Sequence, residues 1–241
     1  RTTETPHKSS VGYAGTKLRV VAAKNKRYLT ADIRARRNRI KADLELEVMD
    51  GLESLVMAVP FEDLPGYFYL NQKMNSMPVK GYVEIGSRIF EFSPQNSFAV
   101  LDWGRGVWPY KCHWYWGNGT TRLEDGSLFG FEIGWGFGDM SAATENMLFY
   151  NGKGHKIGEV HLENNIHKDY MQPWVFSSSD GRFEMTMTPE YDNYTSSRIG
   201  PIGNRCHQVY GKWNGTVVLD DGKELHIKDM TAFCEYSDNR W

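Results

Sequence analysis

The chain has 241 residues, of which 24% are charged and 14% aromatic, and its formal net charge at pH 7 is −2. A nearly neutral chain has no general attraction to nucleic acid or anionic lipid, so we expect neither as a partner. No apolar run is long enough to span a bilayer as a helix, and the length is sufficient for one large β domain or two smaller ones.

In the first part of the chain, alternating polar and apolar residues predict strands. Residues 1–10 are polar and are expected to be a loose end or a connection from missing residues. A short strand is predicted at 17–23, and a hairpin at 28–35 and 40–48, turning around Arg37-Asn38. Further strands are expected at 55–60, 67–74 and 79–92, the last two separated near Pro78 because proline cannot donate to a sheet.

The second part continues with short strands and turn dipeptides such as Asn118-Gly119 and Asp125-Gly126. The predicted strands are 128–137, 147–150, 156–162, 174–178, 182–188, 207–213, 216–219 and 225–236. One helical turn is expected at 141–146, capped by Asp139 or Ser141. Many strands with short turns predict an all-β fold, an antiparallel barrel or sandwich. A break in the pattern at 92–98 suggests two halves, 1–97 and 98–241.

Rings and charges are concentrated in residues 101–117, which predicts a ligand pocket rather than a plain core, because a carboxylate and a guanidinium among rings need a partner. The predicted ligand-binding residues are Asp102, Trp103, Arg105, Trp108, Tyr110, Trp114, Trp116 and Gln208. Trp114 and Trp116 lie on one strand face and are both expected to be buried. Alternatively, Asp102 and Arg105 form a structural ion pair.

A glycine-rich segment at 129–138 places five apolar residues on one strand face and Glu132 among glycines on the other. The glycines allow close sheet packing, or they form the floor of a cavity that holds Glu132. Four side chains are candidates for moving protons, namely Glu132, Asp139, Glu145 and His207. The alternative for Asp139 is that it ties down the following loop.

Other chemistry has little support in the sequence. The seven histidines match no zinc spacing, and no phosphate loop or dinucleotide motif is present, so we expect no metal and no cofactor. The odd number of cysteines, Cys112, Cys206 and Cys234, predicts free thiols and a cytoplasmic location, while a Cys206–Cys234 disulfide remains possible in an oxidising compartment.

Several ordered motifs resemble a bacterial family known as a domain of unknown function, DUF2804. They are residues 102–110, 114–117, 144–146, 152–158, 207–211 and 240–241. Members usually carry an additional N-terminal segment, so this chain is expected to lack its first part. The family resembles the lipocalin-like group of carotenoid hydratases and tocopherol cyclases, which implies two packed barrel-like halves with a cavity. Many members have histidine where this chain has Trp103, so a proton donor there would have to be replaced.

Three functions therefore remain open. The favoured one is a barrel whose enclosed chamber binds a small, largely apolar or ring-containing molecule. The second is an enzyme of the same architecture, a hydratase, cyclase, lyase or glycoside-cleaving enzyme that uses cavity carboxylates, with Arg105 positioning the substrate. The third is a structural or partner-binding module, which would present an exposed apolar patch. The sequence leaves the oligomeric state open.

Overall fold

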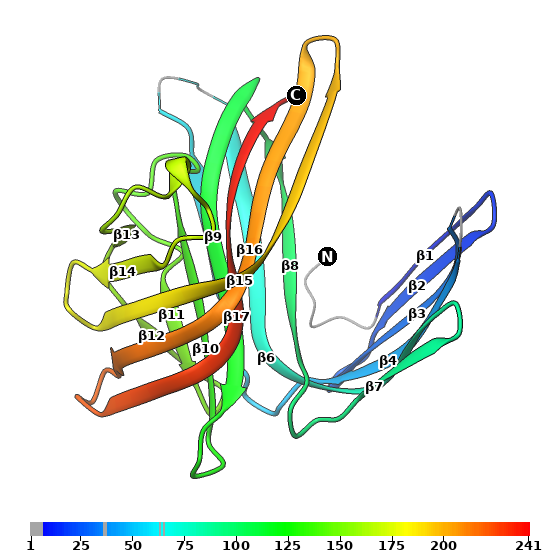
Figure 1. The fold of residues 1–241 in the computed structure, drawn as a ribbon, viewed down its shortest axis with the longest axis horizontal. Helices are drawn as coiled ribbons and strands as arrows, with labels where there is room; N and C mark the ends of the chain where they lie inside the picture. The colour runs from blue at the N-terminus through cyan, green and yellow to red at the C-terminus, as the bar shows by residue number, and fades with distance from the viewer. Residues whose placement is uncertain (1–6, 36–37, 63, 65) are drawn as a thin grey trace. The chain divides into compact units, whose positions relative to one another are not determined.

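The computed structural model describes residues 7–35, 38–62, 64 and 66–241. The all-β prediction is confirmed, since the chain forms two antiparallel sheets, one of them a strongly curled half-barrel (Figure 1). The single helix of the described residues is the short 3-10 helix η1 (Ile166–Lys168). No helix in these residues is long and apolar enough to cross a membrane.

Two compact units divide the chain, one reaching up to Leu52 and including Ser76–Ala99, the other consisting of Glu53–Asn75 and Val100–Trp241. The first unit has strands in the order β1-β2-β3-β4-β6-β7, and the strand β6 runs on into the second unit. The bounds are β1 (His7–Tyr13), β2 (Thr16–Ala22), β3 (Lys26–Arg34), β4 (Arg39–Glu47), β6 (Phe68–Ile85) and β7 (Arg88–Phe92).

In the second unit, β6 also pairs with β5 (Leu55–Pro60) and β8 (Phe98–Val107). Nine further strands form the curled sheet, in the order β12-β11-β10-β9-β17-β16-β15-β14-β13. Their bounds are β9 (Lys111–Arg122), β10 (Leu128–Trp135), β11 (Met147–Tyr150), β12 (Lys153–Lys156), β13 (Val160–Leu162), β14 (Trp174–Ser178), β15 (Phe183–Ile199), β16 (Ile202–Val218) and β17 (Glu224–Arg240).

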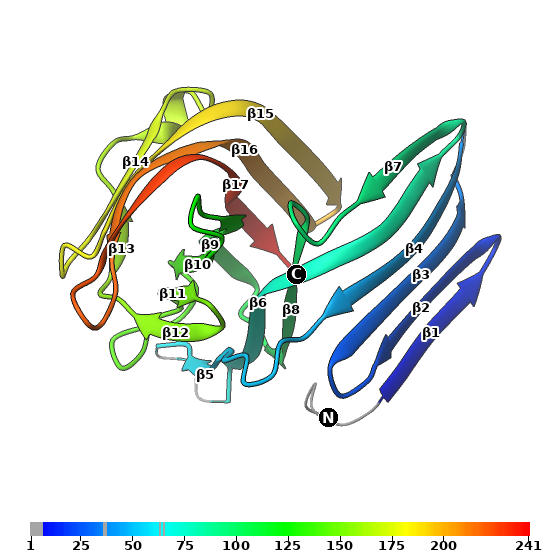
Figure 2. The same ribbon diagram turned by 90° about the horizontal axis from the view of Figure 1, so that it is seen from below.

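The concave face of the curled sheet holds the main hydrophobic core. The sheet bends until β10 and β13 come into contact (Figure 2). Trp213 lies at the centre, 4.8 Å from the ring of Phe131 and 4.6 Å from that of Phe176. These fully buried rings fill the concave side of the sheet. Close packing of this kind supplies most of the stability of a small β core.

The opposite face of the same sheet is also covered. In β9, Trp114, Trp116 and Asn118 point away from the concave core, because side chains alternate along a strand. The neighbouring strands β5 and β11 add a second apolar cluster on this side. It consists of Leu55, Met57, Val59, Met147 and Phe149. With both faces buried, the central strands have no consistently polar side.

Two strand predictions are corrected, and the ring-rich segment 101–117, for which no strand bounds were predicted, is now assigned. Residues 8–10 belong to β1, which pairs with β2, instead of forming a loose end. The ring-rich segment forms β8 and β9, for which aromatic residues are well suited. β6 continues through Pro78, which lies between the end of its register with β5 at Lys73 and the start of its register with β4 at Val79.

Two local predictions are also corrected. Residues 141–146 form no helical turn; instead the Asp139 carboxylate accepts the backbone N–H of Ser141. Asn118-Gly119 lies inside β9, where glycine leaves room for the Ala232 side chain. In the predicted first hairpin, β3 and β4 pair as expected from Lys26 to Glu47, while Arg37 lies outside the described residues.

The packing of β5 predicts a contrast between two valines of one strand. Val59 is 1% exposed and Val56 is 60% exposed. Val59→Ala should lower the free energy of unfolding by about 2 kcal/mol, because it deletes two buried methyl groups. Val56→Ala should change it by no more than roughly 0.5 kcal/mol. Urea denaturation of both variants measures the difference, and equal losses would contradict the placement of this strand.

Candidate functional site

The strand β6 carries a row of polar side chains on one face. Tyr69, Asn71, Lys73 and Asn75 alternate with residues of the other face. The last three are at most 3% exposed, although lysine and asparagine are rarely buried without partners. A strand was predicted at 67–74, but none of these residues was predicted to be functional. Their alternation is the pattern that would have identified them.

Lys73 is the centre of the site. Its Nζ lies 3.3 Å from Oε2 of Glu145 and 3.6 Å from Oδ2 of Asp102. It also lies 4.1 Å from the centre of the Trp116 ring, a favourable cation–π position. Burial by itself lowers the pKa of Lys73, but the carboxylates of Glu145, Glu132 and Asp102 outweigh it and hold the pKa above its ordinary value. The lysine is therefore a buried cation.

Glu145 reaches Lys73 from the loop before β11. Its second oxygen accepts a hydrogen bond from the amide of Asn71. Gly134 makes this approach possible, because a Cβ at that position would lie 2.6 Å from Oε2 of Glu145. The glycine face of β10 thus lets the Glu145 carboxylate come close.

Glu132 lies behind the pocket wall and is completely buried. Its carboxylate accepts hydrogen bonds from Trp116 Nε1 at 2.8 Å, Asn118 Nδ2 at 2.5 Å and Asn75 Nδ2 at 3.3 Å. Burial raises the pKa of Glu132 to about 7, although Lys73, Trp116 and Asn75 favour the ionised form. Glu132 therefore fixes the Trp116 ring and does not itself line the pocket.

A pocket of about 230 Å³ opens above Lys73. Rings form most of its wall, and the charged groups are Lys73 and three carboxylates. Its lining residues are Tyr69, Lys73, Asp102, Trp108, Trp114, Tyr115, Trp116, Trp135, Phe137, Met140, Glu145, Glu235 and Trp241. A concave, mostly apolar site with few fixed polar groups is typical of small-molecule binding.

Further contacts fix the rings. Trp108 packs between Tyr69 at 5.8 Å and Trp241 at 6.2 Å. Trp114 donates its indole N–H to Oε1 of Glu235 at 2.8 Å, and the other oxygen of Glu235 accepts the amide of Gln208 at 2.9 Å. Rings held by such bonds lose little freedom when a ligand stacks on them.

The pocket brings together five of the predicted site residues. These are Asp102, Trp108, Trp114, Trp116 and Glu145. The two tryptophans of β9 share a face as expected, and both are partly rather than fully buried. Gln208 contributes through Glu235, which the sequence analysis missed.

Other predicted residues lie outside this pocket. Within the described residues, Asp102 forms its ion pair with Lys73 and not with Arg105. Arg105 and Trp103 are not among the lining residues. Tyr110 is exposed and donates its hydroxyl to the Pro201 carbonyl at 2.8 Å. Asp139 is bound to its own loop.

His207 lies in a separate hollow with His167, Tyr170, Arg205 and Tyr236. Its Nδ1 is 2.7 Å from Oδ2 of Asp192, and its ring stacks on Tyr170 at 3.6 Å. The predicted proton-transfer candidates are therefore not one constellation. Only Glu145 faces the aromatic pocket.

The described residues contain no group of three or more histidine, cysteine or acidic side chains arranged to hold a metal ion. Cys112, Cys206 and Cys234 are all free, so Cys206 and Cys234 do not form the alternative disulfide. The polar groups of the pocket instead form a lysine–carboxylate cluster, which can bind polar ligand groups or transfer protons.

The comparisons with known proteins agree with the motif resemblance. The DUF2804 family profile, described as a domain of unknown function, matches residues 1–241. No curated protein matches this sequence.

Glu132 predicts a specific pH dependence of stability. Its pKa in the folded protein, about 7, lies above the ordinary value of 4.5, so the folded state holds this proton more tightly than the unfolded state. The resulting stabilisation is complete below pH 4.5 and is lost as the pH rises through 7. Glu132→Gln removes this loss, so the variant should gain stability relative to the wild type between these pH values.

Urea denaturation at several pH values measures the effect. The exposed turn residue Glu124, changed to Gln, serves as the control and should follow the wild type. A constant difference between Glu132→Gln and the wild type would show that the carboxyl has no raised pKa.

Proposed function

The chain belongs to the DUF2804 family, and we propose that it binds a small, ring-containing molecule in the aromatic pocket of its second unit. The observation that carries this proposal is the buried Lys73, held under a wall of tryptophan rings by two carboxylates. A buried ion pair is weak support for stability, since its desolvation cost offsets much of its attraction. A role in orienting a ligand accounts for its position at the pocket.

The walls suit a flat or cyclic ligand. Trp108, Trp114 and Trp116 offer ring faces, on which an aromatic ring or the apolar face of a sugar can stack. Glu235, Asp102 and Glu145 supply acceptors at the edge of such a ligand, and Lys73 supplies donors. The ligand is therefore expected to combine a ring with hydroxyl or other donor groups.

Binding can be tested with simple probes. Saturation-transfer NMR with phenol and with methyl β-glucoside reports which ring type binds. Trp108→Ala should weaken binding about 2- to 10-fold, because it removes one stacking surface. Tyr13→Ala, which removes an 84% exposed ring of the first unit, is the control. Equal binding by the wild type and Trp108→Ala would place the ligand elsewhere.

Acid–base catalysis is a second candidate function. Asp102 and Glu145 converge on one point, the Nζ of Lys73, which is what proton transfer to a single bound group requires. Burial raises the pKa of Tyr69, so its phenol stays protonated as a possible donor. Hydration, cyclisation, elimination and glycoside cleavage remain the candidate reactions.

Solvent exchange tests this candidate. A probe that binds is incubated with the protein in D₂O, and deuterium uptake or turnover is followed by mass spectrometry. Glu145→Gln should lower the rate about 10²- to 10⁴-fold while changing binding far less. Glu184→Gln, an exposed change on β15, should not alter the rate. A rate that survives in Glu145→Gln would exclude this carboxyl as the proton carrier.

Four broader expectations remain proposals. On the motif resemblance alone, we propose a distant relation to the lipocalin-like hydratases and cyclases, and a bacterial origin. The halves 1–97 and 98–241 are proposed as domains. The three free thiols support a cytoplasmic location.

A further inference from the structure

Three strands of the curled sheet, β15, β16 and β17, extend past the hydrophobic core and carry charged residues on one face. Residues that pair directly across antiparallel strands share a face. Arg205 on β16 pairs with Ser196 on β15 and with Asp238 on β17. Two residues nearer the start of β16, and on the same face, Gly203 pairs with Arg198 on β15 and Arg240 on β17. This places three guanidinium groups on one face.

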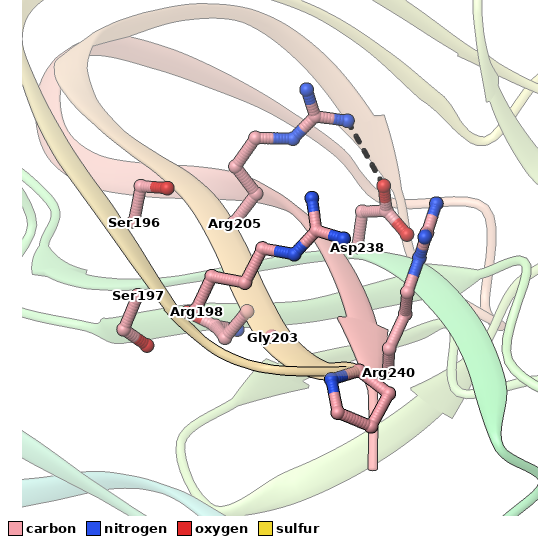
Figure 3. A pocket seen from close by; sticks show the side chains of 9 residues that line it. Ser196, Ser197, Arg198, Gly203, Arg205, Asp238 and Arg240 are labelled. Atoms are coloured by element: carbon pink, nitrogen blue, oxygen red, sulfur yellow. Dashed lines mark hydrogen bonds and ion pairs between the residues drawn. The ribbon is translucent and has the colours of Figure 1, made fainter.

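These residues form a hollow of about 260 Å³ (Figure 3). Arg198, Arg205 and Arg240 extend to the same side, and Ser196, on the same strand as Arg198, lies beside Arg205. The hollow belongs entirely to the second unit and shares no residue with the aromatic pocket.

The charges of the hollow are not balanced. Asp238 pairs with Arg205 at 3.0 Å. Within the described part of the chain, no carboxylate pairs with Arg198 or Arg240; the Nε of Arg198 donates to the Gly200 carbonyl at 3.2 Å. The hollow thus keeps an excess of two positive charges. Like charges gathered in this way are unfavourable until an anion binds.

We propose that this hollow binds the phosphate group of a small phosphate monoester. A phosphate monoester carries nearly two negative charges at pH 7 and so matches the excess, whereas a carboxylate matches only half of it. Guanidinium groups bind phosphate oxygens through paired, charge-assisted hydrogen bonds. The Ser196 hydroxyl is a further donor.

The neighbouring hollow can take the organic part of the ligand. Arg205 lines both hollows, so the two are adjacent at this residue. The second hollow, of about 350 Å³, is walled by Tyr170, Tyr236 and two histidines. Asp192 holds Nδ1 of His207, and among the described residues no hydrogen bond engages its Nε2. This arrangement favours a monoester over free phosphate, and it gives His207 a role outside the aromatic pocket.

Calorimetric titration of the full chain at low ionic strength tests the proposal, with phenyl phosphate and inorganic phosphate as the probes. Phenyl phosphate should bind with a dissociation constant of roughly 1 mM or lower, and inorganic phosphate more weakly. Arg198→Ala and Arg240→Ala should each weaken phenyl phosphate binding about tenfold. Both side chains are exposed, so the fold should survive, and urea denaturation of each variant verifies this.

Two control variants separate this site from other effects. Arg19→Ala removes the same charge from an exposed position in the first unit and should not change the affinity. Trp108→Ala reports on the aromatic pocket instead: a loss of phenyl phosphate affinity in this variant as large as that in Arg198→Ala would place the phenyl phosphate there and contradict the proposal. The proposal would be overturned if Arg19→Ala lost as much affinity for phenyl phosphate as Arg198→Ala does. It would also be overturned if inorganic and phenyl phosphate bound equally tightly, or if the wild type bound neither.

Discussion

The site depends on the compensation of one buried cation. Lys73 is 3% exposed and has Glu145, Asp102 and the Trp116 ring around its ammonium group. An ammonium group that leaves water without such partners costs several kcal/mol. The residues around Lys73 therefore depend on one another. Asn71 donates a hydrogen bond to Glu145, Gly134 leaves space for the Glu145 carboxylate, and Glu132 accepts a hydrogen bond from Trp116.

The two buried faces of β9 position this cluster. On one face Tyr115 packs against Trp135 at 4.7 Å, and Gly117 and Gly119 let the core come close. On the other face, Trp114 and Trp116 form the pocket wall. The same strand thus joins a filled hydrophobic core to an aromatic pocket. A shift of its register by one residue would turn the tryptophans toward the core, so both the core packing and the pocket wall would be lost.

The fold class followed from local sequence features. Alternation in β10 placed Phe129, Phe131 and Ile133 on one face, and all three are completely buried. The tryptophans of residues 101–117 identified much of the pocket wall. The chemistry at its base did not follow from local features, because Lys73 is 72 positions from Glu145 in the chain and meets it only after the sheets have formed. The expected Asp102–Arg105 pair failed for the same reason, since a distant lysine took the place of a near arginine.

A double-mutant cycle on Lys73 and Glu145 tests the central claim most directly. The free energy of unfolding is measured by urea denaturation for the wild type, Lys73→Met, Glu145→Gln and the double variant. If the two charges compensate each other in the interior, each single change should cost about 3–5 kcal/mol and the double change much less than the sum. Additive losses of unfolding free energy would contradict the account, because they would mean that Lys73 and Glu145 do not stabilise each other.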